Sequence, residues 1–111
     1  MKVKQKGIYL FSIPYSNFKE QKIRPALIIS NNKLNNSSED CIILPLTSNI
    51  KNEQYSIIIN NKNLDSGKLI KRSRVRFDKI FNIEQKSALQ SIGAINNETL
   101  QTIRKEILKL I

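Results

Sequence analysis

Basic residues crowd one short stretch of the chain, and only one acidic residue, Asp78, lies among them. The six cations of this stretch are Lys68, Lys71, Arg72, Arg74, Arg76 and Lys79. Alternate residues of a strand share a face, so the arginines and Asp78 are predicted to point one way while Val75 and Phe77 enter the core. A guanidinium is planar and forked and can bind two phosphate oxygens at once. We interpret the stretch as a phosphate-binding stripe; the alternative is a solvated face.

Asp78 follows Arg76 by two residues, which limits what its carboxylate can do. A neighbouring guanidinium favours the charged form, so the pKa of Asp78 is expected to lie below its ordinary value. Such a carboxylate is either the neutralising half of an ion pair or, at a bound phosphodiester, the group that orients or deprotonates a ribose 2′-hydroxyl. The residue pattern leaves both roles open.

Other polar side chains stand where predicted strands begin or end. Arg24 precedes Pro25, which holds its backbone extended, and its simplest role is a charged rim. Thr47 and Ser48 follow an apolar run and offer two hydroxyl groups, whose simplest role is turn capping. Phe18, in a polar loop, is a candidate platform for base stacking.

The 111-residue chain is strongly basic, with a formal net charge of +10. Excess positive charge attracts polyanions, of which nucleic acid is the commonest in a cell. The chain has no histidine and a single cysteine, Cys41, which excludes a Ser-His-Asp triad, a His-ligated zinc site, a disulfide framework and a thiolate metal cluster. Any catalysis must therefore use Arg, Lys, Asp, Glu, Ser, Thr or Tyr, and we expect neither a metal nor a cofactor.

Nothing in the sequence predicts a membrane segment or a secretory signal. No uninterrupted apolar run exceeds four residues, far short of the roughly 20 that a spanning helix needs, and the basic N-terminus is not followed by an apolar stretch. The length suits one domain. We therefore expect a single cytoplasmic domain over residues 1–111 with no membrane partner.

Short apolar runs alternate with asparagine-rich breaks, a pattern typical of strands joined by turns. We predict strands or extended segments at residues 7–13, 25–30, 41–46, 54–59, 69–80 and 89–95. The aromatic and cysteine residues expected in the core are Tyr9, Phe11, Cys41 and Phe81. From Asn97 onward Leu100, Ile103, Ile107 and Leu110 fall at helical spacing, and Asn96 or Asn97 can cap the helix. These elements predict a mostly β, mixed α/β fold: a small, strongly bent sheet or partly open barrel closed by a C-terminal helix.

Five short blocks occur in a recognisable order along the chain. They are Gly7-Ile8-Tyr9, Arg24-Pro25-Ala26-Leu27-Ile28-Ile29-Ser30, Leu44-Pro45-Leu46-Thr47-Ser48, Arg74-Val75-Arg76-Phe77-Asp78-Lys79-Ile80 and Ile92-Gly93, followed by the terminal helix. Each block alone is short, but together and in this order they resemble the MazF/PemK (Kid) family of toxin endoribonucleases. The resemblance covers roughly residues 6–111.

The resemblance implies a small SH3-like β-barrel, of the kind shared by MazF, PemK and CcdB, that forms a homodimer. It also implies metal-independent cleavage of single-stranded mRNA at short sequences, in which the ribose 2′-hydroxyl attacks phosphorus to give a 2′,3′-cyclic phosphate and a 5′-hydroxyl. Such an enzyme would be the toxin of a toxin–antitoxin pair. Its partner would be an acidic antitoxin whose charge complements the basic cleft.

By position, four residues match the catalytic groups of the family. Arg24 matches the arginine of its Arg-Pro block, and Thr47 matches the hydroxyl residue that holds the scissile phosphate. Arg76 and Asp78 match the Arg-x-Asp pair that is assigned acid and base roles in the PemK branch. A guanidinium has too high a pKa to donate a proton readily, so we expect both arginines to act as electrostatic clamps.

This chain departs from the family at one point. Some PemK-branch members carry a histidine in the loop before the Arg-Pro block, and this chain has none. Phe18 lies near that place, and Lys19 or Lys22 would supply the missing stabilisation. The residues expected to contact RNA are Phe18, Lys19, Lys22, Ser48, Lys71, Arg72, Arg74 and Lys79.

Two other functions remain open on the sequence. One is a protein-binding toxin like CcdB, which acts on DNA gyrase and needs no phosphate-cleaving cluster. The other is a noncatalytic basic barrel, which would bind nucleic acid with a steep salt dependence and no turnover. Assaying RNA cleavage beside gyrase-dependent DNA damage separates the three functions.

Overall fold

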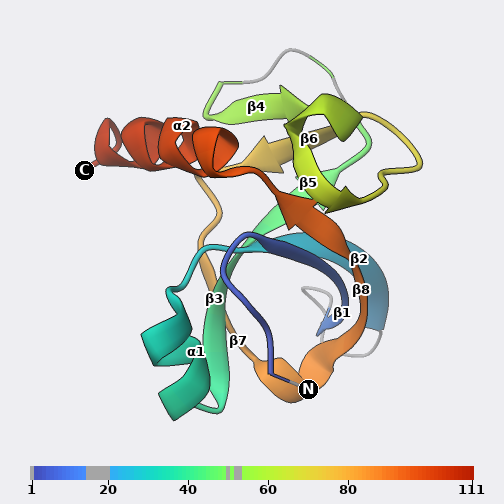
Figure 1. The fold of residues 1–111 in the computed structure, drawn as a ribbon, viewed down its shortest axis with the longest axis vertical. Helices are drawn as coiled ribbons and strands as arrows, with labels where there is room; N and C mark the ends of the chain where they lie inside the picture. The colour runs from blue at the N-terminus through green and yellow to red at the C-terminus, as the bar shows by residue number, and fades with distance from the viewer. Residues whose placement is uncertain (1, 15–20, 50, 52–53) are drawn as a thin grey trace.

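The computed structural model describes residues 2–14, 21–49, 51 and 54–111. Within this part of the chain, eight strands form one antiparallel sheet that curls into a half-barrel (Figure 1). The strands are β1 (Gly7–Pro14), β2 (Gln21–Ile28), β3 (Asp40–Thr47), β4 (Ser56–Ile59), β5 (Leu64–Gly67), β6 (Ser73–Arg76), β7 (Phe81–Glu84) and β8 (Ala88–Ile95). Their order across the sheet is β4-β6-β3-β2-β1-β8-β5, and β7 pairs with β3.

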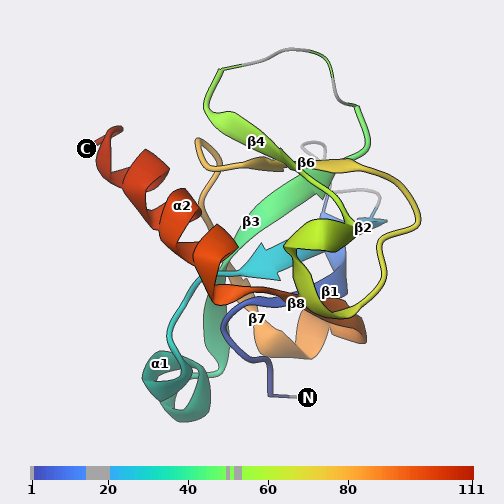
Figure 2. The ribbon, with the colours of Figure 1, turned by 45° about the horizontal axis from the view of Figure 1, so that its top comes forward.

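Two α-helices are described: α1 (Asn32–Ser37) lies beside β3, and α2 (Asn97–Leu108) follows β8 (Figures 1 and 2). Asn96 caps α2 as predicted, because its side chain accepts a hydrogen bond of 2.8 Å from the Thr99 amide. Leu100 and Ile103 bury the apolar face of α2 in the core. Neither described helix is long and apolar enough to span a membrane.

Two glycines let β5 and β8 approach each other closely. Gly67 has a φ of +76°, and a Cβ atom there would lie 2.1 Å from the carbonyl oxygen of Ile92. A Cβ atom on Gly93 would lie 2.4 Å from the carbonyl oxygen of Ser66. Both distances are far inside van der Waals contact, so only glycine fits. The β1–β8 ladder also shifts register twice, and such irregularities bend a sheet.

The central strands bury both of their faces, because successive side chains of a strand point to opposite sides. One face contributes to a first core that also receives α2: its strand residues include Ile8, Leu27, Leu44, Leu46 and Val75. The other face contributes to a second core made chiefly of Tyr9, Phe11, Ala26, Ile28, Cys41 and Ile43. The expectations that Tyr9, Phe11 and Cys41 are core residues are therefore confirmed.

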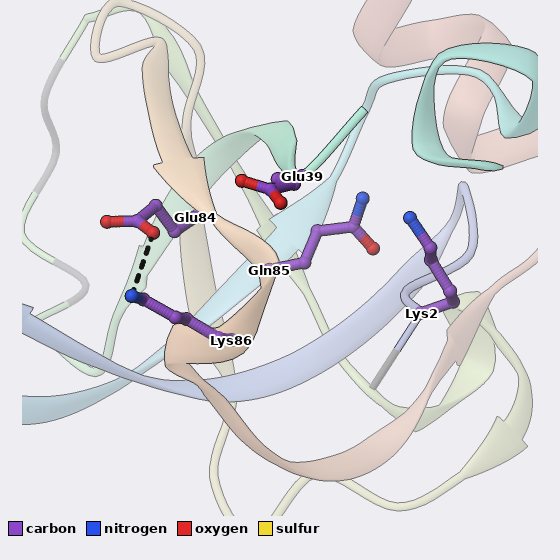
Figure 3. Close-up of a pocket in the computed structure, with 5 residues that line it drawn as sticks. All are labelled: Lys2, Glu39, Glu84, Gln85 and Lys86. Atoms are coloured by element: carbon purple, nitrogen blue, oxygen red, sulfur yellow. Dashed lines mark ion pairs between the residues drawn. The ribbon is translucent and has the colours of Figure 1, made fainter. Parts of the chain in front are cut away.

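Gln85 closes the second core beside the N-terminal segment (Figure 3). Its Oε1 accepts a hydrogen bond of 3.0 Å from the Val3 amide. Its Nε2 lies within hydrogen-bond distance of the carbonyl oxygens of Asn35 (2.8 Å), Ser38 (2.9 Å) and Asp40 (3.1 Å). One buried side chain thus ties the N-terminus, α1 and β3 together, next to a cavity of about 300 Å³.

The structure confirms the fold class and corrects several local predictions. The segment at 69–80 is not one long extended element, because only Ser73–Arg76 is paired and a turn follows at Phe77. Two paired strands, β5 and β7, were not predicted. The asparagines after Ser30 do not form a simple turn, since Asn31 caps the short helix α1.

One side chain expected in the core is exposed, and the predicted apolar face of the C-terminal helix ends before its last residue. Phe81 is 38 % exposed because it begins β7, which pairs only with β3 among the described strands. Leu110 is 39 % exposed because α2 ends at Leu108 and the helical spacing no longer applies beyond it.

Candidate functional site

Thr47 lies at the end of β3 and shares a face of the sheet with two arginines of β6. The register pairs Thr47 with Arg74 and Leu46 with Val75. Directly opposed residues of an antiparallel pair point to the same side. Leu46 and Val75 point into the first core, so Thr47 and Arg74 point to the opposite face. Arg76 follows Arg74 by two residues and shares that face.

Arg24 reaches the same face from β2, the strand on the other side of β3. The described β2–β3 ladder begins at the pair Ala26–Pro45. Arg24 precedes Ala26 by two residues and Thr47 follows Pro45 by two, so both point to the side of that pair. Pro25 and Pro45 lie at this end of the ladder, and neither has a backbone N–H group that could donate a hydrogen bond to the opposite strand. Arg24 is exposed there.

Arg76 and Asp78 form a two-pronged ion pair. Nε of Arg76 donates to Oδ1 at 3.1 Å and Nη2 donates to Oδ2 at 2.7 Å. The two side chains are 27 % and 29 % exposed. Asp78 lies in the turn after β6 and not on the strand, so the guanidinium, and not strand alternation, sets its position. Hydrogen bonds from Arg76, aided by its charge, hold the pKa of Asp78 below its ordinary value of 3.8, as predicted.

The Thr47 hydroxyl takes part in the turn that follows β3. Its Oγ1 accepts a hydrogen bond of 3.1 Å from the Asn49 amide, which is the turn-capping role considered from the sequence. A hydroxyl that accepts one hydrogen bond still has its own proton to donate. Thr47 can therefore cap the turn and donate to a phosphate oxygen at the same time. Ser48 is exposed beside it.

Arg74 corrects the expectation that all the arginines of the basic stretch lie on the surface. Its side chain shares the face of Arg76, yet the residue is only 4 % exposed. Its Nε donates to the Asn49 carbonyl at 3.0 Å and its Nη1 to Ser56 Oγ at 3.4 Å. Strand alternation assigned the face correctly, but the connection between β3 and β4 covers this position.

The remaining predicted RNA contacts are divided between two faces, because Lys22 lies two residues before Arg24 on β2 and shares its face, while Lys71 borders a groove on the other. Lys22, Lys71, Arg72 and Lys79 are exposed. Lys71 and Lys68 border an open, mainly apolar groove of about 530 Å³ whose wall includes Pro25 and Ile70. Pro25 and Arg24 are successive residues of β2, so the groove lies on the side away from Arg24. Phe18 and Lys19 lie outside the described residues.

The described residues that could ligate a metal are dispersed. No group of three or more Cys, Asp or Glu side chains in this part of the chain is placed to hold an ion. The groups on the face that carries Thr47 are instead cations, a hydroxyl and, through the ion pair with Arg76, one carboxylate. Such a set can bind and polarise a phosphodiester.

Comparison with known proteins identifies the family of the chain. The profile of the PemK-like, MazF-like toxin of type II toxin–antitoxin systems matches residues 4–111. No curated protein sequence matches the chain significantly.

Solved structures share the fold at low sequence identity. A MazE–MazF complex from Deinococcus radiodurans is 18 % identical with a TM-score of 0.78, over 99 % of this chain and 96 % of that one. An endoribonuclease in complex with its cognate antitoxin from a mycobacterial species is 19 % identical, with a TM-score of 0.77 over 96 % and 92 %. The Mycobacterium tuberculosis toxin MazF-mt6 is 16 % identical, with a TM-score of 0.74 over 93 % of both chains. The family match spans nearly the whole sequence, and the chain therefore belongs to the PemK-like, MazF-like toxin family of type II toxin–antitoxin systems.

Proposed function

We propose that this protein is a metal-independent endoribonuclease and the toxin of a toxin–antitoxin pair. It cleaves single-stranded mRNA in the cytoplasm through attack of a ribose 2′-hydroxyl on the adjacent phosphorus. The observation that carries the proposal is the shared face of β2, β3 and β6, on which Arg24, Thr47 and Arg76 point the same way. Structural neighbours described as endoribonucleases support it.

The geometry suits stabilisation of a phosphorane. Thr47 stands on the middle strand, with Arg24 on one neighbouring strand and Arg76 on the other. Two guanidinium groups approach the non-bridging oxygens from either side while the hydroxyl donates between them. A preorganised donor of this kind is worth roughly 10²–10³ in kcat. Holding the 2′-hydroxyl in line with the phosphorus supplies a further part of the rate.

Asp78 serves as the acceptor for the 2′-hydroxyl. Each of its oxygens accepts one hydrogen bond from Arg76 and keeps a lone pair. Its lowered pKa makes it a weak base, so its main contribution is to orient the 2′-hydroxyl. It takes the proton of this hydroxyl only as the new P–O bond forms and the bond from phosphorus to the 5′-oxygen breaks, and it passes that proton to the hydroxide that remains when water protonates the departing oxygen. The departing 5′-oxygen receives its proton from water, because neither guanidinium releases one readily. The products are a 2′,3′-cyclic phosphate and a 5′-hydroxyl.

An acidic antitoxin is the partner this surface favours. The chain carries a formal net charge of +10, and complementary charge speeds and directs association. Two structural neighbours were solved in complex with an antitoxin. The groove bordered by Lys68 and Lys71 combines cations with apolar walls and suits an acidic segment that carries an aliphatic side chain. A homodimer, which sedimentation would measure, belongs to the same proposal.

The test is cleavage of single-stranded RNA by the purified protein in EDTA. We expect cuts at defined positions by primer extension, with 5′-hydroxyl ends that polynucleotide kinase labels directly. Arg24→Ala should abolish cutting, whereas Arg104→Ala, an exposed change on α2, should not. Intact RNA together with gyrase-dependent DNA breakage would support the gyrase-directed alternative. Binding without turnover would support a noncatalytic barrel, and retained cleavage in Arg24→Ala would remove Arg24 from the mechanism.

A further inference from the structure

A single buried arginine donates hydrogen bonds to both ends of the connection between β3 and β4. Arg74 is 4 % exposed. Its Nε donates to the carbonyl oxygen of Asn49, just after β3, and its Nη1 donates to the hydroxyl of Ser56, the first residue of β4. Burying a cation is costly unless the fold gives it partners. The guanidinium of Arg74 finds such partners, because its planar fork donates to two acceptors from two different nitrogens.

The hydrogen bonds of Arg74 lead to the Thr47 hydroxyl. Asn49, whose carbonyl Arg74 holds, donates its own amide to Thr47 Oγ1 at 3.1 Å. Fixing the carbonyl and the amide of one residue fixes the backbone between them. It also fixes the direction from which the hydroxyl receives its hydrogen bond, and so the directions left for its proton. Thr47 is in addition the register partner of Arg74 on β3.

We propose that Arg74 is a positioning residue of the ribonuclease site, which orients the Thr47 hydroxyl through the backbone of Asn49 without touching RNA. This inference rests on the proposed function. It replaces the expectation of a direct RNA contact, which the burial of the side chain disfavours. It also explains why this position carries an arginine and not a lysine, because a single ammonium group cannot present two donors at the spacing of a guanidinium fork.

The experiment is a double-mutant cycle between Arg74→Lys and Thr47→Ala, read by steady-state kinetics on single-stranded RNA. Arg74→Lys keeps the charge and loses the fork. We expect it to lower kcat roughly tenfold or more, as small misplacements of reacting groups do, with KM changed by less than about twofold. In the Thr47→Ala background the same change should lower kcat by less than about twofold, because the hydroxyl it orients is gone.

Arg104→Lys is the matched control, since the same substitution there lies on the exposed side of α2 and should leave both constants unchanged. Equal loss of kcat in the two Thr47 backgrounds would overturn the inference, because Arg74 would then act independently of Thr47. A raised KM with an unchanged kcat would also overturn it and restore a direct RNA contact.

Amide hydrogen exchange at Asn49 separates this inference from the proposed function. In Arg74→Lys we expect faster exchange at the Asn49 amide, measured well below the unfolding temperature of the variant so that global unfolding does not contribute. Unchanged exchange there would overturn the inference whatever the activity. If the wild-type protein cuts no RNA, the proposed function fails and the positioning role of Arg74 in catalysis fails with it, while faster exchange at Asn49 in Arg74→Lys would still establish that Arg74 holds the backbone of Asn49.

Discussion

Polar side chains converge at two regions of this molecule, the Gln85 cluster beside the N-terminus (Figure 3) and the face that carries Thr47 and Arg76. At Gln85 the amide is buried, and its oxygen and nitrogen are both engaged by backbone groups. At the other region Arg24 is exposed, and the side chains of Arg76 and Asp78 are 27 % and 29 % exposed. The Thr47 hydroxyl there still has a proton to donate.

The difference shows why a cavity alone does not indicate a functional site. The pocket beside Gln85 is open to solvent, and the amide at its edge already uses its oxygen and nitrogen in hydrogen bonds to the backbone. On the face that carries Thr47, the fold positions donors and acceptors that can still form hydrogen bonds with another molecule. Changes at the first region should therefore alter stability, and changes at the second should alter activity.

Among the changes that distinguish these two regions, the largest effect is expected from Arg76→Met. Loss of one phosphate-binding cation should lower kcat by roughly 10²–10³, measured by RNA cleavage under saturating substrate. Its ion pair with Asp78 is partly exposed, and such pairs contribute about 1 kcal/mol or less to stability. Thermal unfolding should therefore change little.

Lys86→Met is the control for Arg76→Met, because it also removes a cation from an ion pair. The partner of Lys86 is Glu84, at 3.2 Å, in the Gln85 region. We expect neither kcat nor stability to change measurably in this variant. Full activity in Arg76→Met, or an equal loss in Lys86→Met, would contradict the distinction between the two regions.

Gln85→Ala should show the opposite behaviour. It leaves the buried Val3 amide and neighbouring carbonyls without their partner, and we expect a loss of about 2–4 kcal/mol in the free energy of unfolding. The activity of the molecules that remain folded should not change. Chemical denaturation followed by circular dichroism measures the first quantity, and Gln101→Ala, an exposed change on α2, is its control.

Cys41 offers a local readout for the same variant. The thiol lies in the second core, and burial raises its pKa to about 11, so at mildly alkaline pH it reacts only when that core opens. We expect faster thiol labelling in Gln85→Ala and unchanged labelling in Arg76→Met. Loss of activity in Gln85→Ala with normal stability and slow labelling would refute the structural role of this cluster.

The elements that could be predicted from the sequence are those with a local signal, such as an apolar run, helical spacing or a capping residue. Strands β1, β2, β3 and β8 contain apolar runs, and α2 has both a helical spacing and an asparagine cap. Strands β5 and β7 have mixed, partly polar sequences and exist because they pair with β8 and β3, far away in the chain. The short helix α1 depends on the Asn31 cap and on Asn35, a buried polar residue whose amide donates to the Ser30 carbonyl.

The candidate site shows the same limit at the level of single residues. Alternation along β6 was enough to predict that Arg74 and Arg76 share a face and that Val75 lies in the core. Alternation does not say what lies over a face, so the burial of Arg74 under the β3–β4 connection could not be foreseen. The Asn49 link has no signal in the sequence, because it uses backbone atoms that every residue has.

The smallest expected effect is a shift in the acid limb of the activity profile. Hydrogen bonds from Arg76 lower the pKa of Asp78, so the catalytic anion should persist below the ordinary value of 3.8, and activity should fall only as the pH drops through the lowered value. The stability from this pair has the same sign: it is present above the unfolded pKa and lost as the pH falls through the folded one. In Arg76→Met the limb of the residual activity should move upward, toward 3.8, because the first cause of the lowering is gone. In Gln85→Ala it should not move.

The measurement is the pH dependence of cleavage from about pH 3 to 6, with the same RNA for every variant. Because the substrate titrates equally in all of these assays, its titration cancels when the variants are compared. An identical limb in wild type and Arg76→Met would show that Asp78 is not the group that must be ionised, and the 2′-hydroxyl would then need another acceptor on this face.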